Sequence, residues 1–443
     1  MRKLFPPVLL LSCATAVATC FADKSSSSSS DPDEVVKARE FVDRLQKEEY
    51  EQAVKQFDDA MLAKVPADKL KEVWEGLAAS FGKFKQTGKP RSEKVEGYFF
   101  VFIPCAFQKA TLDAKVVFKD GKITGLFFTP SAVEYKPPKY VKEDAFQEIQ
   151  VKFGAEEWRL PGTLRMPKGD GPFPALILVH GSGANDRDET VFGIKPLRDL
   201  AAGLASQDIA VLAYDKRTFV HGAKIPKKFT VKEEVIDDVV MAVEMLQDRK
   251  DVDPKRIFIL GHSLGGMLIP RIAERTGQAA GFIVMSGPAR PLEDLLLEQN
   301  IYLLSLQEKP TDKMKEQLEA LKKHIERIKA PDLSPDTPAE ELVGAPATYW
   351  LDLRDYQPAV AAAKIKQPLL VLQGERDYQV TMADFALWKK QLADKKTVQL
   401  KSYPKLNHLM MAGEGKSKPD EYTAEGHVDQ EVIDDIARWI KKL

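Results

Sequence analysis

Hydrophobic and polar positions follow two different patterns in the first third of the chain. Over residues 34–81, apolar residues recur every three or four positions, which predicts amphipathic helices. Over residues 97–128, apolar runs flank a Lys-Asp-Gly-Lys turn at 119–122, which predicts an antiparallel hairpin. Helices followed by antiparallel strands predict a small α+β domain over residues 34–130.

After a proline-containing linker at 131–144, short apolar runs alternate with helical patterns as far as the C-terminus. We expect strands at 145–153, 159–166, 173–179, 209–214, 257–260, 281–285, 368–372 and 398–403, and helices at 231–247 and 431–442. Such alternation predicts an α/β fold over residues 145–443, with a mostly parallel, doubly wound sheet. Residues 287–366 interrupt the alternation with helical patterns and are predicted to form a lid insertion.

The N-terminal stretch differs from both regions. Residues 1–3 are basic, residues 4–21 are largely apolar, and Cys20 and Ala22 are small residues at the two positions that a signal peptidase reads. This pattern predicts a signal peptide at 1–22 and a periplasmic or secreted protein. A membrane anchor that stays attached is the alternative.

Cysteine usage and the next residues refine this expectation. A serine-rich tether is predicted at 23–33. A lipoprotein with the lipid on Cys20 or Cys13 is a further alternative, although neither site fits the usual acceptor pattern well. Cleavage after Ala22 leaves Cys105 as the single cysteine, so we expect no internal disulfide.

Composition excludes several classes of function. Of 443 residues, 44% are hydrophobic and 30% charged, which is typical of a globular protein. The net charge of −1 gives no electrostatic basis for binding nucleic acid or an anionic membrane. We find no metal-ligand spacing, phosphate loop or dinucleotide fingerprint, so no cofactor and no metal are expected.

One motif lies where a predicted strand meets a predicted helix. The apolar run 257–260 is followed by Gly-x-Ser-x-Gly at 261–265 and then by a helical pattern. A strand, a tight turn and a helix are the context of a nucleophile elbow, in which glycines allow the strand and helix to approach closely. Ser263 is therefore the candidate nucleophile.

A serine nucleophile needs a histidine to accept its proton and a carboxylate to orient that histidine. In this context the chain order is serine, acid, histidine, with the acid after a late strand. Asp377 follows the apolar run 368–372 and is the predicted acid, with Glu375 and Asp352 as alternatives.

The predicted base is His408, which follows the last predicted strand. His427 is the other histidine downstream of Asp377, and it lies in a polar stretch that reads as a solvated loop.

The oxyanion of the intermediate needs two backbone N–H groups. One is expected from Leu264, the residue after the nucleophile, and the other from Ser182 in the loop at 180–183. Gly181 would keep this backbone close, and His180 would shape the loop without acting as a base.

Taken together, these motifs resemble the α/β-hydrolase superfamily, and most of all its bacterial esterase branch, which is similar to dienelactone hydrolases and acyl-CoA thioester hydrolases. The resemblance covers residues 145–443 and rests on His180-Gly-Ser-Gly-Ala-Asn-Asp-Arg-Asp-Glu-Thr190, Tyr214-Asp-Lys-Arg217, Gly261-His-Ser-Leu-Gly265, Gly374-Glu-Arg-Asp377 and Leu406-Asn-His408. Residues 34–130 resemble a small cone-like α+β domain of uncharacterised role that precedes secreted members, and a structural or dimerising role is expected for them.

The resemblance implies hydrolysis of a small-molecule carboxylic ester through an acyl-enzyme on Ser263. A serine peptidase or a thioesterase of the same fold is the alternative, and a catalytically idle binding module is a third. Acyl-CoA is an unexpected substrate for an exported protein.

Overall fold

The computed structural model describes residues 32–131 and 135–443, apart from 96 and 109–110. The predicted signal peptide and most of the predicted tether lie outside these residues. The chain divides into two compact units, one before Tyr135 and the other comprising Tyr135–Leu443. None of the described helices is long and apolar enough to cross a membrane.

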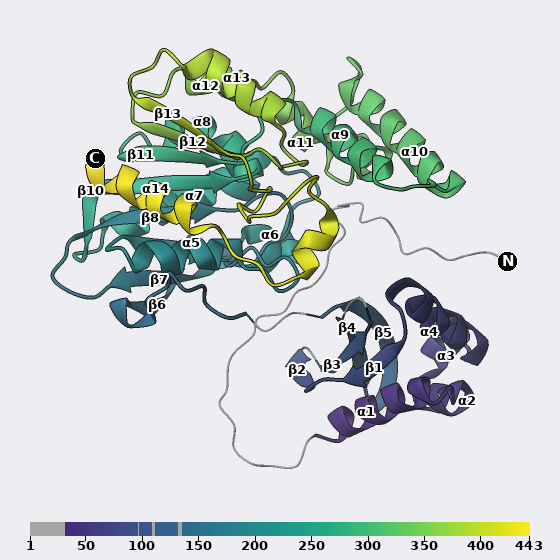
Figure 1. Ribbon diagram of the computed structural model, residues 1–443. Coiled ribbons are helices and arrows are strands. Elements are labelled where there is room, and N and C mark those ends of the chain that lie inside the picture. Colours follow the sequence, from purple (N-terminus) through teal and green to yellow (C-terminus); the bar gives the residue numbers. More distant parts are fainter. Residues whose placement is uncertain (1–31, 96, 109–110, 132–134) are drawn as a thin grey trace. The chain divides into compact units, whose positions relative to one another are not determined.

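In the smaller unit, helices pack on one face of a five-stranded sheet of order β1-β3-β4-β5, with β2 paired to β3 (Figure 1). Phe41 and Leu70 from the helices and Ile103 from the sheet are fully buried in its core. Its elements are α1 (Asp33–Gln46), α2 (Tyr50–Ala53), η1 (Val54–Gln56), α3 (Asp59–Lys64), α4 (Ala67–Phe81), β1 (Phe84–Thr87), β2 (Arg91–Val95), β3 (Tyr98–Phe107), β4 (Thr111–Lys119) and β5 (Lys122–Pro130).

The helices-then-strands pattern predicted this α+β arrangement, but it missed β1 and β2. Both strands are short and mostly polar, with Phe84 and Val95 as their large apolar residues, so they lack the alternation that marks a half-buried strand. They pair through their backbones with the apolar β3, and this partner cannot be read from their own side chains. Cys105 of β3 is buried, and burial raises the pKa of its thiol to about 12.

The larger unit contains an eight-stranded sheet of order β13-β12-β11-β10-β8-β9-β7-β6. Five neighbouring pairs are parallel, whereas β7 runs antiparallel to both β6 and β9. The predicted mostly parallel α/β sheet is thereby confirmed. Its strands are β6 (Phe146–Phe153), β7 (Leu160–Pro167), β8 (Phe173–Val179), β9 (Ala210–Tyr214), β10 (Val252–His262), β11 (Gly281–Met285), β12 (Leu369–Gly374) and β13 (Val398–Tyr403).

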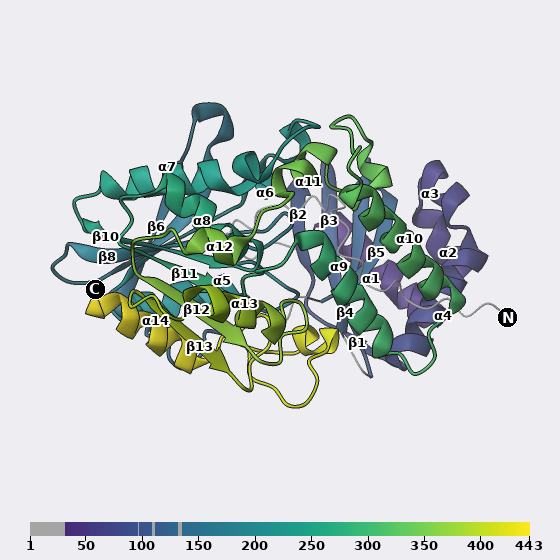
Figure 2. The same ribbon diagram turned by 90° about the horizontal axis from the view of Figure 1, so that it is seen from above.

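Helices cover both faces of this sheet (Figure 2). Alternate residues of β8 show the division, because Leu176 and Leu178 join one core and Ile177 joins the other. A strand buried on both faces must be apolar throughout, which explains the unbroken hydrophobic runs. One core contains α5 (Pro196–Ala205) and α14 (Gln430–Lys442), and the other contains α7 (Asp237–Gln247), α8 (Leu264–Arg275) and α13 (Met382–Leu392).

The segment predicted to be a lid insertion follows β11. Its helices α9 (Leu292–Ser305) and α10 (Asp312–Lys329) lie beyond the carboxyl ends of the parallel strands (Figures 1 and 2). Its last helix, α12 (Pro358–Ala362), instead packs on a face of the sheet against α8 and α13. Trp350, Leu342 and Ile328 form a small hydrophobic cluster within the segment. It comprises α9 (Leu292–Ser305), α10 (Asp312–Lys329), η6 (Ala339–Glu341), α11 (Ala347–Leu353) and α12 (Pro358–Ala362).

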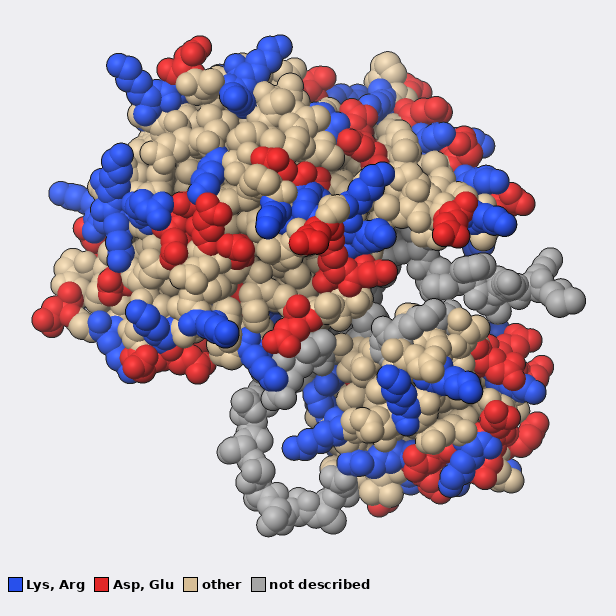
Figure 3. Space-filling model, viewed as in Figure 1, with Lys and Arg blue, Asp and Glu red and all other residues tan. Residues whose placement is uncertain are grey.

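Charged side chains of both signs are interspersed over the visible face of each unit (Figure 3). This distribution accompanies the nearly balanced total of 65 lysine and arginine against 66 aspartate and glutamate residues.

Candidate active site

Ser263 occupies a strained turn between β10 and α8. Its φ of +52° and ψ of −118° lie in a region that residues other than glycine rarely adopt. The turn needs glycines around it, since a Cβ on Gly265 would lie 2.7 Å from the carbonyl oxygens of Val179 and His180. The geometry matches the predicted elbow, in which a serine is presented above the sheet at a strand-to-helix turn.

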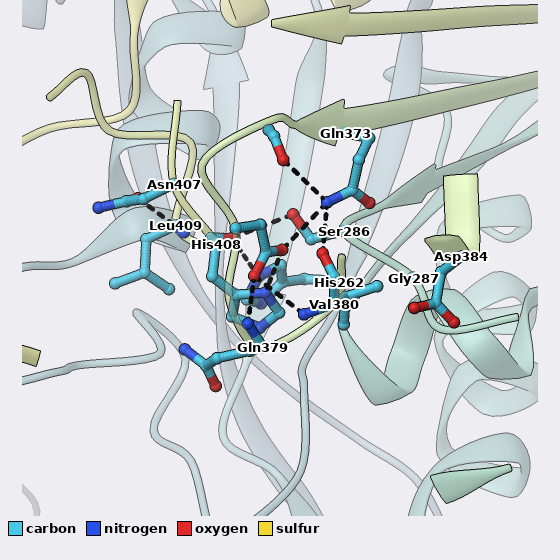
Figure 4. Close-up of polar contacts among 12 residues, drawn as sticks. His262, Ser286, Gly287, Gln373, Gln379, Val380, Asp384, Asn407, His408 and Leu409 are labelled. Carbon is cyan, nitrogen blue, oxygen red and sulfur yellow. Dashed lines mark hydrogen bonds and ion pairs between the residues drawn. The ribbon is translucent and has the colours of Figure 1, made fainter. Parts of the chain in front are cut away.

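Asp377 and His408 form a buried pair on the loops that follow the neighbouring strands β12 and β13. Figure 4 shows His408 close to Gln379 and Val380 of the acid's loop. His408 Nδ1 lies 2.7 Å from Asp377 Oδ2, and the other carboxylate oxygen accepts hydrogen bonds from the backbone N–H groups of Gln379 and Val380 at 2.8 and 2.9 Å. The carboxylate, which is fixed by the two backbone N–H groups, accepts a hydrogen bond from Nδ1–H, and this leaves Nε2 of His408 as the basic nitrogen.

A side chain that the sequence analysis did not single out also holds the acid. Gln373 is buried on β12, and its Nε2 donates to Asp377 Oδ2 at 3.1 Å and to the carbonyl of Val380 at 2.8 Å. The sequence does show an amide side chain at the end of an otherwise apolar strand. Because a buried amide requires hydrogen-bond partners, this position could have indicated a residue that supports the acid.

The alternative residues lie in other environments. Glu375 accepts a hydrogen bond from a serine of β13, and Asp352 pairs with Arg271. His427 contacts Asp199 on α5, with Nδ1 at 3.1 Å from Oδ2. The structure thus brings Asp377 and His408 together and gives these alternatives other partners.

The loop after β8 passes directly beside the elbow. A Cβ on Gly181 would lie 3.1 Å from Ser263 Cβ, which explains the glycine. The N–H of Gly181 already donates to Glu189 Oε1 at 2.6 Å, so the next amide along the loop is that of Ser182. Leu264 is the first residue of α8, where an N–H has no acceptor within the helix. These amides are the donors predicted for an oxyanion hole.

His180, at the start of this loop, is buried in contact with an aromatic ring. Its ring lies edge-on to that of Tyr214, with 5.2 Å between centroids. Burial lowers the pKa of His180 to about 4, so the ring is neutral near pH 7. A neutral, packed imidazole agrees with the expectation that His180 shapes the loop.

Two further buried ionisable residues adjoin the site and were not assigned from the sequence. Glu189 lies in the loop that follows Ser182, and His262 lies immediately before Ser263. Their side chains pair at 2.8 Å, and both are almost fully buried. A glutamate within a run of charged residues reads as a solvated loop, so its burial becomes visible only in the structure.

Within the described residues, no group of three or more His, Cys, Asp and Glu side chains is arranged to hold a metal ion.

Two known protein families match parts of this chain. The family described as serine aminopeptidase, S33, matches residues 193–415, which include Ser263, Asp377 and His408. A family described as a protein of unknown function (DUF3887) matches residues 38–126.

Individual relatives extend the similarity over most of the chain. Esterase EstD of Thermotoga maritima is 41% identical over 405 residues, which cover 91% of this chain and 94% of that protein. Among solved structures, the Pyrococcus furiosus esterase Pf2001 is 18% identical with a TM-score of 0.45, covering 71% of this chain and 96% of that one. Est1E from Butyrivibrio proteoclasticus is 16% identical with a TM-score of 0.44, covering 66% of this chain and 99% of that one.

The family match and the relative that spans both chains confirm the resemblance inferred from the motifs. This chain is an enzyme that belongs to the α/β-hydrolase superfamily, within the family described as serine aminopeptidase, S33.

Proposed function

We propose that this enzyme hydrolyses carboxylic esters through an acyl-enzyme on Ser263. The observation that carries the proposal is the buried Asp377–His408 pair, whose histidine ring lies 4.8 Å from the ring of His262, the residue next to Ser263. The name of the Thermotoga maritima relative adds support for an ester substrate.

In the proposed reaction, His408 Nε2 takes the proton of the Ser263 hydroxyl as its oxygen attacks the ester carbonyl. The N–H groups of Leu264 and Ser182 stabilise the negative oxygen of the tetrahedral intermediate. The intermediate collapses as His408 protonates the leaving alcohol. Water, deprotonated by His408, then attacks the acyl-enzyme and releases the carboxylic acid and free Ser263.

The test is the hydrolysis of p-nitrophenyl esters of increasing acyl length by wild type and by Ser263→Ala. We expect kcat to fall by about 10⁴-fold or more in the variant, with unchanged secondary structure. Ser334→Ala, at an exposed serine between α10 and α11, is the matched control and should retain wild-type turnover. Equal turnover in wild type and Ser263→Ala would refute the proposal.

A peptidase is the second candidate because the matching family is described as serine aminopeptidase. Aminoacyl p-nitroanilides assayed beside the esters separate the two activities, since both leaving groups are chromogenic. A fluorophosphonate probe labels only an activated serine. Labelling is therefore expected for an esterase, a peptidase or a thioesterase, and no labelling is expected for a catalytically idle binding module.

For location and assembly, we propose an exported protein. Fractionation of cells that produce the full chain tests export, and detergent partitioning of wild type against Cys20→Ala separates a soluble product from a lipoprotein. Light scattering of the purified protein tests the dimerising role proposed for residues 34–130.

A further inference from the structure

A buried carboxylate outside the proposed triad connects three loops of the site. Glu189 Oε1 accepts the N–H of Gly181 at 2.6 Å, and Glu189 Oε2 lies 2.8 Å from His262 Nδ1. The other ring nitrogen of His262 lies 3.1 Å from the backbone carbonyl oxygen of His408. Residues 180–183, which would supply an oxyanion donor, are called the oxyanion loop below. The contacts link this loop to the nucleophile elbow and, through His262, to the backbone of His408, the proposed base.

The contacts of His262 fix its charge. Both of its ring nitrogens face oxygen acceptors, one from a carboxylate and one from a backbone carbonyl, so both must carry hydrogen and the ring is an imidazolium. Burial alone would lower the pKa of His262, but the charge and hydrogen bond of Glu189 outweigh burial and raise it. Burial likewise favours the neutral form of Glu189, yet His262 lowers the pKa of that carboxyl.

The backbone around the pair is held in costly conformations. Glu189 and Ser286 have φ values of +51° and +48°, in the region that favours glycine. The hydroxyl of Ser286 donates to the same carbonyl of His408 at 3.1 Å (Figure 4). This carbonyl therefore accepts hydrogen bonds from His262, at the end of β10, and from Ser286, directly after β11. A carbonyl fixed in this way restrains the whole residue that it belongs to.

We propose that Glu189 and His262 are positioning residues, whose buried ion pair holds the oxyanion loop and the His408 loop against the nucleophile elbow. This inference rests on the proposed function and deepens it. Asp377 orients the ring of His408, whereas His262 fixes its backbone. The bond from Gly181 to Glu189 holds the loop so that the next amide, that of Ser182, is presented to the oxyanion.

The test compares Glu189→Ala with Glu189→Gln in ester hydrolysis and in the rate of fluorophosphonate labelling. Glu189→Ala removes the bridge, and we expect kcat and the labelling rate to fall about 100-fold while KM changes less than about threefold, because the reacting groups lose their alignment. Glu189→Gln keeps an acceptor for Gly181 and a donor for neutral His262, so its kcat should recover to within about fivefold of wild type.

Asp199→Ala is the matched control. Asp199 is also a fully buried carboxylate that contacts a histidine, His427, and accepts a backbone N–H, that of Val428, at 3.0 Å. His427 and Val428 lie at the far end of the β13–α14 connection that carries His408, and these bonds do not reach the loops of Ser182, Ser263 or Asp377. At a comparable loss in Tm, Asp199→Ala should keep wild-type kcat, which separates positioning from a general loss of stability.

A kcat in folded Glu189→Ala within fivefold of that of Asp199→Ala would overturn the proposal, and so would a Glu189→Gln variant as impaired as Glu189→Ala. If Glu189→Ala does not fold, His262→Gln carries the same test, with at least a tenfold loss of kcat expected and an unchanged kcat contradicting it. Failure of the proposed function would look different, because wild type would then neither cleave esters nor react with the probe.

Discussion

At the scale of single residues, the site depends on backbone conformations that isolated residues avoid. Ser263, Glu189, Ser286 and Met410 all have positive φ values, and each lies on a loop that adjoins the proposed triad. Such conformations persist only where neighbouring contacts fix them. The chemistry is therefore sensitive to changes that leave every catalytic side chain in place.

Gly181→Ala tests this sensitivity. The new Cβ would lie 2.9 Å from Glu189 Oε1 and 3.1 Å from Ser263 Cβ, so the loop must move away from the elbow. We expect kcat for ester hydrolysis to fall about 100-fold, as for the loss of one oxyanion donor. Gly222→Ala is the control, since a Cβ there meets nothing within 4 Å. Wild-type kcat in Gly181→Ala would contradict the account of the loop.

The Glu189–His262 pair also predicts how stability depends on pH. The pKa of His262 is raised above 6.5. Its contribution to the free energy of unfolding is therefore complete below pH 6.5 and is lost as pH rises through the raised pKa. The pKa of Glu189 is lowered below 4.5. Its contribution to the free energy of unfolding is therefore complete above pH 4.5 and is lost as pH falls through the lowered pKa.

The measurement is the Tm of wild type minus that of Glu189→Gln, recorded across pH. We expect the difference to be largest between pH 4.5 and 6.5 and to shrink on both sides. A difference that is constant over the whole range would show that the pair is not ionised.

At the scale of elements, the acid turn after β12 is held from two directions. Gln373 supports Asp377 from within the sheet. On the other side, Tyr302 of α9 stacks on Tyr378, the residue after the acid, with ring centroids 4.9 Å apart and planes at 9°. The hydroxyl of Tyr302 also donates to the carbonyl of Ser417 at 2.7 Å. Through Tyr302, helix α9 of the inserted segment thus packs against the loop that carries Asp377.

Tyr302→Ala should loosen this attachment. We expect kcat/KM for p-nitrophenyl esters to fall about tenfold, because α9 and the acid turn lose an aromatic stack and a hydrogen bond. Tyr302→Phe keeps the stack and loses only the hydrogen bond, so it should stay within about threefold of wild type. Equal values for Tyr302→Ala and wild type would mean that α9 has no influence on the acid turn.

The sequence predicts features that depend on neighbouring residues better than features that depend on which strands pair in the sheet. The elbow and the acid follow from strand ends and chain order, and the structure places Asp377 against His408 as that order requires. Glu189 and His262 are 73 positions apart, and their pairing depends on the order of strands in the sheet, which one sequence without relatives does not specify. Polar edge strands such as β2 are missed for a similar reason, since their partner determines their structure.

At the scale of the whole molecule, the hydrophobic core of the small unit is separate from those of the large unit. The core of the small unit is built around residues such as Phe41 and Leu70, and the sheet of the large unit is buried on both faces. Units with separate cores are expected to unfold as separate cooperative steps.

Calorimetry of the full chain should therefore show two transitions. Leu70→Ala, at a fully buried position of the small unit, should lower the stability of one transition by about 3 kcal/mol and leave the other in place. Ile259→Ala, at a fully buried position of β10, should act on the other transition only. A single transition that both substitutions shift would show that the two units unfold together.

Ser263 is proposed to carry the acyl group during turnover, and locating that group on the protein tests this directly. Wild type is mixed with a p-nitrophenyl ester, quenched with acid before the steady state, digested and analysed by mass spectrometry. We predict a burst of p-nitrophenol and the added acyl mass on the peptide that contains Ser263, with neither in Ser263→Ala. A burst with the acyl group on another residue, or unchanged turnover in Ser263→Ala, would contradict the account.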